Sequence, residues 1–148
     1  MATVQRFQDL KTWQLARELN KRIYEITARG SFARDFGLRD QIRRASISVS
    51  SNIAEGFERR SPADFARFLT IAKASGAEVL SQLYLALDLD YIDRSSFEAI
   101  SAHLDETNRA IAGLIRYLRS PKGKTAREPE IPYEINSEPG TRNSELNT

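Results

Sequence analysis

The sequence predicts an all-α fold, an antiparallel up-down bundle of four long helices over residues 1–119. Apolar residues recur at three- and four-residue spacing in four long segments, which is the mark of amphipathic helices. No segment shows the sustained two-residue alternation of a strand. The segments are joined by short connections, which favour antiparallel neighbours. The 148 residues are enough for one core and too few for two comfortable domains.

The first helix is expected over residues 10–28. Gly30 is expected to end it, because glycine adopts the left-handed conformation at low cost. Charged side chains occupy the opposite face of the helix. Its apolar stripe is Leu15, Leu19, Ile23 and Ile26.

The second helix is expected over residues 37–59. Its serine-rich middle has only modest helix propensity, so packing has to hold it in the helical conformation. The helical spacing of its apolar residues predicts a helix in spite of that low propensity. Its stripe is Leu38, Ile42, Ala45, Val49, Ile53 and Gly56.

The third helix has the clearest start signal and is expected over residues 61–90. Ser61 is an N-cap residue, Pro62 suits the first helical turn, and Asp64 is an acid at the third position. A fourth helix is expected over residues 95–119, where Ser120 and Pro121 break it. Residues 120–148 contain four prolines and few apolar residues, and we expect them to form a disordered tail.

Composition excludes several classes of protein. Cysteine is absent, which rules out disulfides, cysteine metal sites and a cysteine nucleophile, and fits a reducing compartment. The sequence has no apolar run of about eighteen residues and no signal-peptide layout at its start, so we expect a cytoplasmic protein and no membrane contact. The chain has 22 basic and 20 acidic residues. Four of the basic and five of the acidic residues lie after Arg119, so basic residues outnumber acidic ones in the bundle, which is mildly basic. A mildly basic domain is compatible with nucleic acid but does not establish its binding.

No catalytic or metal-binding pattern stands out. His103 is the only histidine, and a lone histidine is more often a plain surface residue than a ligand. A Gly-x-Ser-x-Gly elbow and a glycine-rich phosphate loop are both missing. Glu55 and Glu78 are the acids expected to be partly buried, and each is expected to cap, to hydrogen-bond or to pair with an arginine such as Arg43 or Arg44. We therefore expect no enzyme activity, no metal and no cofactor.

The second and third helices also carry small and apolar residues opposite their core stripes. Such residues on a would-be solvent face suggest contact with another chain. The alternative is scattered surface hydrophobic residues, which are common. We prefer self-assembly, because two adjacent helices share the feature. The candidate interface residues are Ile47, Ser50, Ala54, Ile71 and Ala74.

Basic side chains are the remaining functional signal. On one subunit they alternate with acids and usually form a solvated face. Repeated around a ring of subunits, they would form several weak patches that engage one polyanion together. The candidate nucleic-acid contacts are Lys21, Arg22, Arg39, Arg43 and Arg44. For Arg43 and Arg44, structural pairing with Glu55 or Glu78 fits equally well.

Residues 37–78 closely resemble the family of 23S rRNA intervening-sequence proteins, also called the S23 family. The segment Gln41–Ala45 matches the family's Gln-Ile-Arg-Arg-Ala motif, and the segment Asn52–Gly56 matches Asn-Ile-Ala-Glu-Gly. The family's next pattern, Ile-Ala followed by Ser and Glu, is matched by Ile71, Ala72, Ser75 and Glu78. Ala74 stands where the family often has glycine. The opening residues Phe7, Leu10 and Trp13 also fit.

The resemblance implies a four-helix bundle that assembles as a homo-oligomer, a pentameric ring. It also implies a gene that can lie inside an inserted element of a bacterial large-subunit rRNA gene. The family is similar to the accessory protein of diversity-generating retroelements, a basic bundle thought to bind nucleic acid beside a reverse transcriptase. Two functions are open: an oligomer that binds RNA or DNA, and a protein-interaction scaffold with no nucleic-acid binding.

Overall fold

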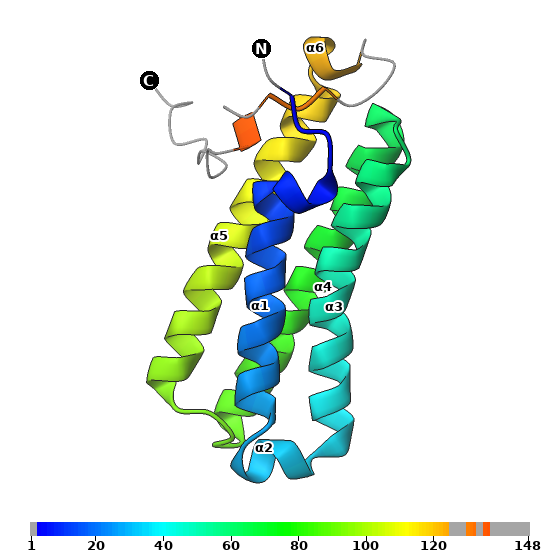
Figure 1. Ribbon diagram of the computed structural model, residues 1–148. Coiled ribbons are helices and arrows are strands. Elements are labelled where there is room, and N and C mark those ends of the chain that lie inside the picture. Colours follow the sequence, from blue (N-terminus) through cyan, green and yellow to red (C-terminus); the bar gives the residue numbers. More distant parts are fainter. Residues whose placement is uncertain (1–2, 125–129, 133–134, 137–148) are drawn as a thin grey trace, which may run out of the picture.

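The computed structural model describes residues 3–124, 130–132 and 135–136. Its four long helices are α1 (Lys11–Thr27), α3 (Phe36–Glu58), α4 (Pro62–Asp88) and α5 (Arg94–Arg119). Three short elements accompany them: a 3-10 turn η1 (Phe7–Asp9), α2 (Gly30–Arg34) and α6 (Pro121–Lys124). The long helices run alternately down and up (Figure 1), so the predicted antiparallel up-down bundle is confirmed.

The core lies between four helices that each contact two neighbours. Both α1 and α4 pack against α3 and α5, which places α1 and α4 on opposite sides of the core. The predicted apolar stripes fill two clusters, one toward each end of the bundle. The cluster nearer the termini includes Leu10, Val49, Phe57, Phe65, Leu69 and Ile111. The other includes Leu19, Ile23, Phe32, Ile42, Leu83 and Leu104.

The connection between α1 and α3 contains a helix that the sequence pattern did not predict. Gly30 has a φ of +57°, as expected at the end of α1, and α2 starts there. Phe32 on α2 is fully buried and closes this end of the bundle, and Tyr91 packs against it at 5.4 Å between ring centroids. The hydroxyl of Tyr91 donates to Asp35 Oδ2 at 2.9 Å, and this bond raises the pKa of Tyr91.

The starts of α4 and α5 are capped by side chains of the expected type. Ser61 Oγ accepts from the Asp64 backbone N–H at 3.3 Å, as the sequence predicted for α4. At the start of α5 the cap is Asp93, whose carboxylate accepts from the Ser96 N–H at 2.7 Å. This hydrogen bond lowers the pKa of the Asp93 carboxyl. The predicted start near Ser95 was therefore slightly late.

Described parts of the region after Arg119 pack on the bundle, which differs from the predicted disordered tail. Ile131 is fully buried, and its carbonyl accepts from the Val4 N–H at 3.0 Å. Asn136 binds the start of α1, since its Oδ1 accepts from the Lys11 N–H at 2.6 Å. Residues 125–129, 133–134 and 137–148 lie outside the described residues.

Candidate functional site

The residues of the matched motifs on α3 divide between two seams, one with α1 and one with α4. On the α1 side, Asn20 is the centre of a polar cluster. Its Oδ1 accepts from Ser46 Oγ at 2.7 Å, and its Nδ2 donates to Ser50 Oγ at 2.9 Å. Further along the same seam, Arg43 Nε donates to Thr27 Oγ1 at 2.8 Å. The serine-rich middle of α3 thus serves the contact between the helices.

The α4 side of α3 carries a shallow polar groove of about 390 Å³. Ser48 and Ser75 close its floor, with 2.8 Å between their hydroxyl oxygens. Arg44 of α3 and Glu78 of α4 are both exposed at its edges. The other residues that line it are Gln41, Ala45 and Gln82. Five of these seven residues belong to the matched motifs, so the groove is where the motifs converge.

The predicted burial of the two glutamates is wrong, and within the described residues neither forms an ion pair with Arg43 or Arg44. Both Glu55 and Glu78 are exposed. Glu55 pairs with Arg59 of its own helix, at 3.9 Å between oxygen and nitrogen. Arg43 instead lies over the Tyr24 ring, at 4.3 Å from the centroid.

Most of the predicted interface residues face outward beside this groove. Ile47 on α3 is 40% exposed and Ile71 on α4 is 41% exposed. Ala74 is exposed and Ala54 is half-buried. Ser50 is a correction, because it is only 8% exposed and lies beneath Asn20 in the seam with α1. The outward faces of α3 and α4 are therefore more apolar than a solvated bundle needs.

Three of the five predicted nucleic-acid contacts are engaged within the chain. Arg43 is held in the α1 seam as described above. Arg22 Nε lies 3.5 Å from Glu18 Oε1. Arg39 Nη1 donates to the Ala33 carbonyl at 3.1 Å, and its guanidinium lies over the Phe36 ring. Arg39 and Arg43 stabilise the bundle and are less available to a polyanion, whereas the pair of Arg22 with Glu18 is half-exposed and therefore weak.

The other two, Lys21 and Arg44, are exposed and have no ion pair in the described part of the chain. Lys21 lies on the outer face of α1, where it shares a shallow hollow with Arg17. Arg44 is at the edge of the α3–α4 groove. The two cations are on different helices and in different hollows, so one chain does not bring the five predicted residues together.

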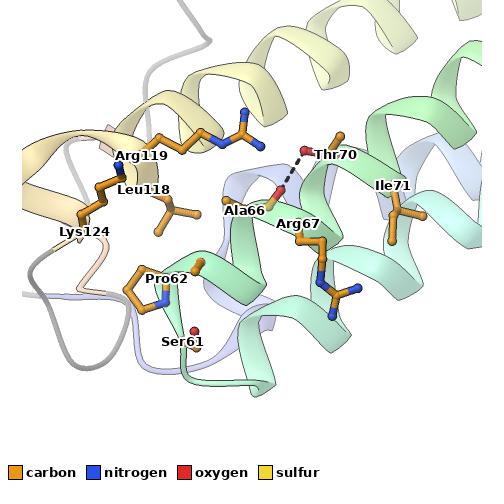
Figure 2. Close-up of a pocket in the computed structure, with 10 residues that line it drawn as sticks. Ser61, Pro62, Ala66, Arg67, Thr70, Ile71, Leu118, Arg119 and Lys124 are labelled. Carbon is orange, nitrogen blue, oxygen red and sulfur yellow. Dashed lines mark hydrogen bonds between the residues drawn. The ribbon is translucent and has the colours of Figure 1, made fainter.

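A larger pocket, of about 720 Å³, lies between the start of α4, the end of α5 and α6 (Figure 2). It was not anticipated from the sequence. Three basic side chains line it, Arg67, Arg119 and Lys124. Two of them come from the end of α5 and from α6, a region that was treated as a helix end and a tail. Their closeness to Arg67 depends on the tertiary fold, so no local pattern signals it.

Three further points bear on function: the lone histidine, and the possibilities of a metal site and of a membrane span. His103 is half-buried, and its Nε2 donates to the Leu15 carbonyl at 2.8 Å, so it joins α5 to α1 rather than facing solvent. Among residues 3–124, 130–132 and 135–136, no group of three or more His, Asp or Glu side chains is placed to hold a metal ion. Within the same residues, no helix has the length and apolar character that crossing a bilayer requires.

Comparison with known proteins points to one family. Residues 8–113 match the family model described as 23S rRNA-intervening sequence protein. The crystal structure of a protein of unknown function from the S23 ribosomal protein family of Bacteroides thetaiotaomicron is similar, with a TM-score of 0.66 and 28% sequence identity. That similarity covers 71% of this chain and 98% of the other. No functionally curated protein matches the chain.

Proposed function

This chain belongs to the family of 23S rRNA-intervening sequence proteins, and from that premise we propose that it is a non-enzymatic bundle that assembles with copies of itself and binds RNA or DNA. The assembly is a ring in the cytoplasm, and five is the subunit number that the family resemblance implies. Exposed basic side chains, repeated around the ring, make the contacts with nucleic acid.

One observation carries the assembly: Ile47 and Ile71 are about two-fifths exposed on the outward faces of two helices that pack together. Each isoleucine gains free energy if a second chain covers it. The same two helices form the groove edged by Arg44 and Glu78, opposite charges with no ion pair within the described chain. A neighbouring subunit that covers the isoleucines would also bring polar groups to these two side chains.

Support for nucleic-acid binding comes from Lys21 and Arg44, whose charges the described part of the chain does not pair. In a ring each cation recurs once per subunit, and several weak contacts to one strand add up. Binding of this kind is electrostatic and loses affinity as salt rises. The mildly basic bundle is consistent with weak, sequence-independent contact to phosphates.

The assembly is tested by native mass in solution, measured by light scattering on a sizing column. We expect a multiple of the 16.8 kDa of one chain. Ile47→Glu is expected to give a single-chain mass with unchanged helical circular dichroism, because it places a charge in the apolar contact. Ser95→Glu, at the exposed start of α5, is the matched control and should keep the native mass. A wild-type mass of one chain would contradict the assembly.

RNA binding is tested on the same column with a ribosomal RNA fragment and a salt series. Binding is expected to weaken linearly on a log–log plot of affinity against salt. Lys21→Gln should reduce that slope by about 1, as removal of one phosphate contact does. Lys73→Gln, an exposed lysine outside the predicted set, should leave the slope unchanged. Equal slopes for the wild type, Lys21→Gln and Lys73→Gln would show that Lys21 does not contact the RNA.

A protein-interaction scaffold is the second candidate, favoured by the engagement of Arg22, Arg39 and Arg43 within the chain. A scaffold needs the outward faces of α3 and α4 but no free cations. A ring whose mass does not respond to RNA at low salt would favour this candidate over nucleic-acid binding.

A further inference from the structure

The pocket between α4, α5 and α6 has the size of a small-molecule site. Its volume of about 720 Å³ falls within the roughly 300–1,000 Å³ typical of ligand pockets. Figure 2 shows Arg119 extending along α4 toward Thr70, while Leu118 and Lys124 lie toward the α6 end, across from Pro62. The walls come from segments about fifty residues apart in sequence, so folding alone creates the site.

Charge in this pocket has one sign. Three of its ten lining residues are cations and none is a carboxylate. Arg119 and Lys124 are exposed and have no ion pair in the described part of the chain. Arg67 has a partner in Asp64, but the 3.8 Å contact is between two side chains that are about half exposed, and such pairs are weak. An anion entering the pocket would meet unneutralised positive charge.

Helix stabilisation explains only part of this charge. A cation in the last turn of a helix interacts favourably with the helix dipole, which accounts for Arg119 at the end of α5. Lys124 is in α6 and lies beyond that turn. Its position is fixed by close packing, because Gly123 is buried and a Cβ there would meet Leu118 Cα at 2.8 Å. Ser120 Oγ also accepts from the Gly123 N–H at 3.3 Å. The turn therefore holds Lys124 at the pocket.

Apolar side chains form much of the remaining wall, together with the hydroxyl residues Ser61 and Thr70. Pro62, Ala66 and Leu118 are buried and line the pocket. A bare inorganic ion would leave this surface unused, whereas a nucleotide has an apolar base face and a charged phosphate. Base faces stack on or pack against apolar side chains, and cations bind phosphate by charge-assisted hydrogen bonds.

We propose that this pocket binds a nucleotide, with its phosphate held by Arg119 and Lys124 and its base against the apolar part of the walls. The site uses none of the five basic residues predicted from sequence, and it shares only Ile71 with the proposed subunit contact. It extends beyond residues 8–113, which match the family model, so Arg119 and Lys124 make it a feature of this chain. The source of the phosphate is a free nucleotide or the 5′ end of a strand.

The test is isothermal titration of the full chain with adenosine 5′-monophosphate and, separately, with adenosine. The monophosphate is expected to bind, more weakly as salt rises, and adenosine to bind at least about tenfold more weakly. Arg119→Glu and Lys124→Glu should each weaken monophosphate binding by about tenfold or more. Arg94→Glu makes the same charge change at the opposite end of α5 (Figure 1) and should have no effect.

A 5′-phosphorylated RNA hexamer distinguishes the two sources. Equal affinity for hexamer and monophosphate would assign the site to free nucleotides, and tighter hexamer binding would assign it to a strand end. The proposal is overturned if neither probe binds, or if Arg119→Glu and Arg94→Glu bind alike. RNA binding that persists with its Lys21 dependence in that case would leave the proposed function standing without this site.

Discussion

Along its α1 seam, α3 presents polar side chains that all have partners, whereas along its α4 groove it presents charges that do not. Ser46 and Ser50 both bond to Asn20, and Arg43 bonds to Thr27. In the groove, Arg44 remains exposed without an ion pair in the described residues. Successive residues of one motif therefore differ in availability, and only the groove side is open to a second molecule.

The difference follows from helix geometry. Consecutive residues of an α-helix are about 100° apart around its axis, so Arg43 and Arg44 point into different seams. Small polar residues hydrogen-bond across both contacts of α3, as Asn20 and Ser46 do toward α1 and as Ser48 and Ser75 do toward α4. Where the helices leave a groove, side chains stay hydrated until a partner arrives.

The largest expected effect on stability is at Gly56, where α3 packs tightly against phenylalanines of α4. A Cβ on Gly56 would lie 2.6 Å from Phe68 Cβ and 3.0 Å from Phe65 Cδ1. Gly56→Val is expected to lower the free energy of unfolding by about 3 kcal/mol, through overpacking. Gly37→Val is the control, since a Cβ there has only an ordinary contact with Asp35 at 3.7 Å. Urea unfolding followed by circular dichroism measures both, and equal stabilities would show that the contact at Gly56 relaxes freely.

The α1 seam is expected to be the next most sensitive. Asn20→Ala removes the partner of Ser46, which is fully buried, and one partner of Ser50. An unsatisfied buried hydroxyl is costly, so we expect a loss of about 2 kcal/mol. Gln41→Ala is the matched change on the groove side, where Gln41 has a single 3.4 Å contact with Gln82. It should change stability by less than about 0.5 kcal/mol, and a larger loss would mean that the groove is as structural as the seam.

The long helices could be predicted from sequence because their apolar periods extend over many turns. The five residues of α2 are too few to show a period, so its role in burying Phe32 was visible only in the fold. The cap that Asn136 supplies to α1 joins residues 125 positions apart, and no local signal encodes such a pairing. The buried Ile131 belongs to the same class of long-range contact.

The site could be predicted only in part. The apolar outward positions Ile47 and Ile71 are exposed as expected, since helical spacing alone sets them opposite the core. Ser50 was misassigned because it lies about 60° from the centre of that face, close enough to α1 to be covered. Glu55 and Glu78 were expected to be buried because their sequence neighbours are small and apolar, but adjacent residues on a helix do not share a face.

The smallest expected effect gives the sharpest test of the two sides of α3. Arg43→Ala removes the bond to Thr27 and the stacking on Tyr24, and should cost about 1 kcal/mol. Arg44→Ala removes no contact in the described chain and should change stability by less than about 0.5 kcal/mol. Both are measured by urea unfolding in the Ile47→Glu background, because assembly of the wild type would add to apparent stability.

In the otherwise wild-type chain, native mass should respond in the opposite way to these two substitutions. Arg44→Ala should have the larger effect on mass, and Arg43→Ala the smaller. Arg44→Ala is expected to lower the native mass or raise the concentration needed for assembly, because Arg44 edges the groove that a neighbouring subunit would cover. Arg43→Ala leaves that edge intact and should keep the native mass, since the bundle tolerates a loss of about 1 kcal/mol. If Arg43→Ala dissociated the assembly and Arg44→Ala did not, the contact surface would lie over the α1 seam, and the open groove would be a hydrated hollow.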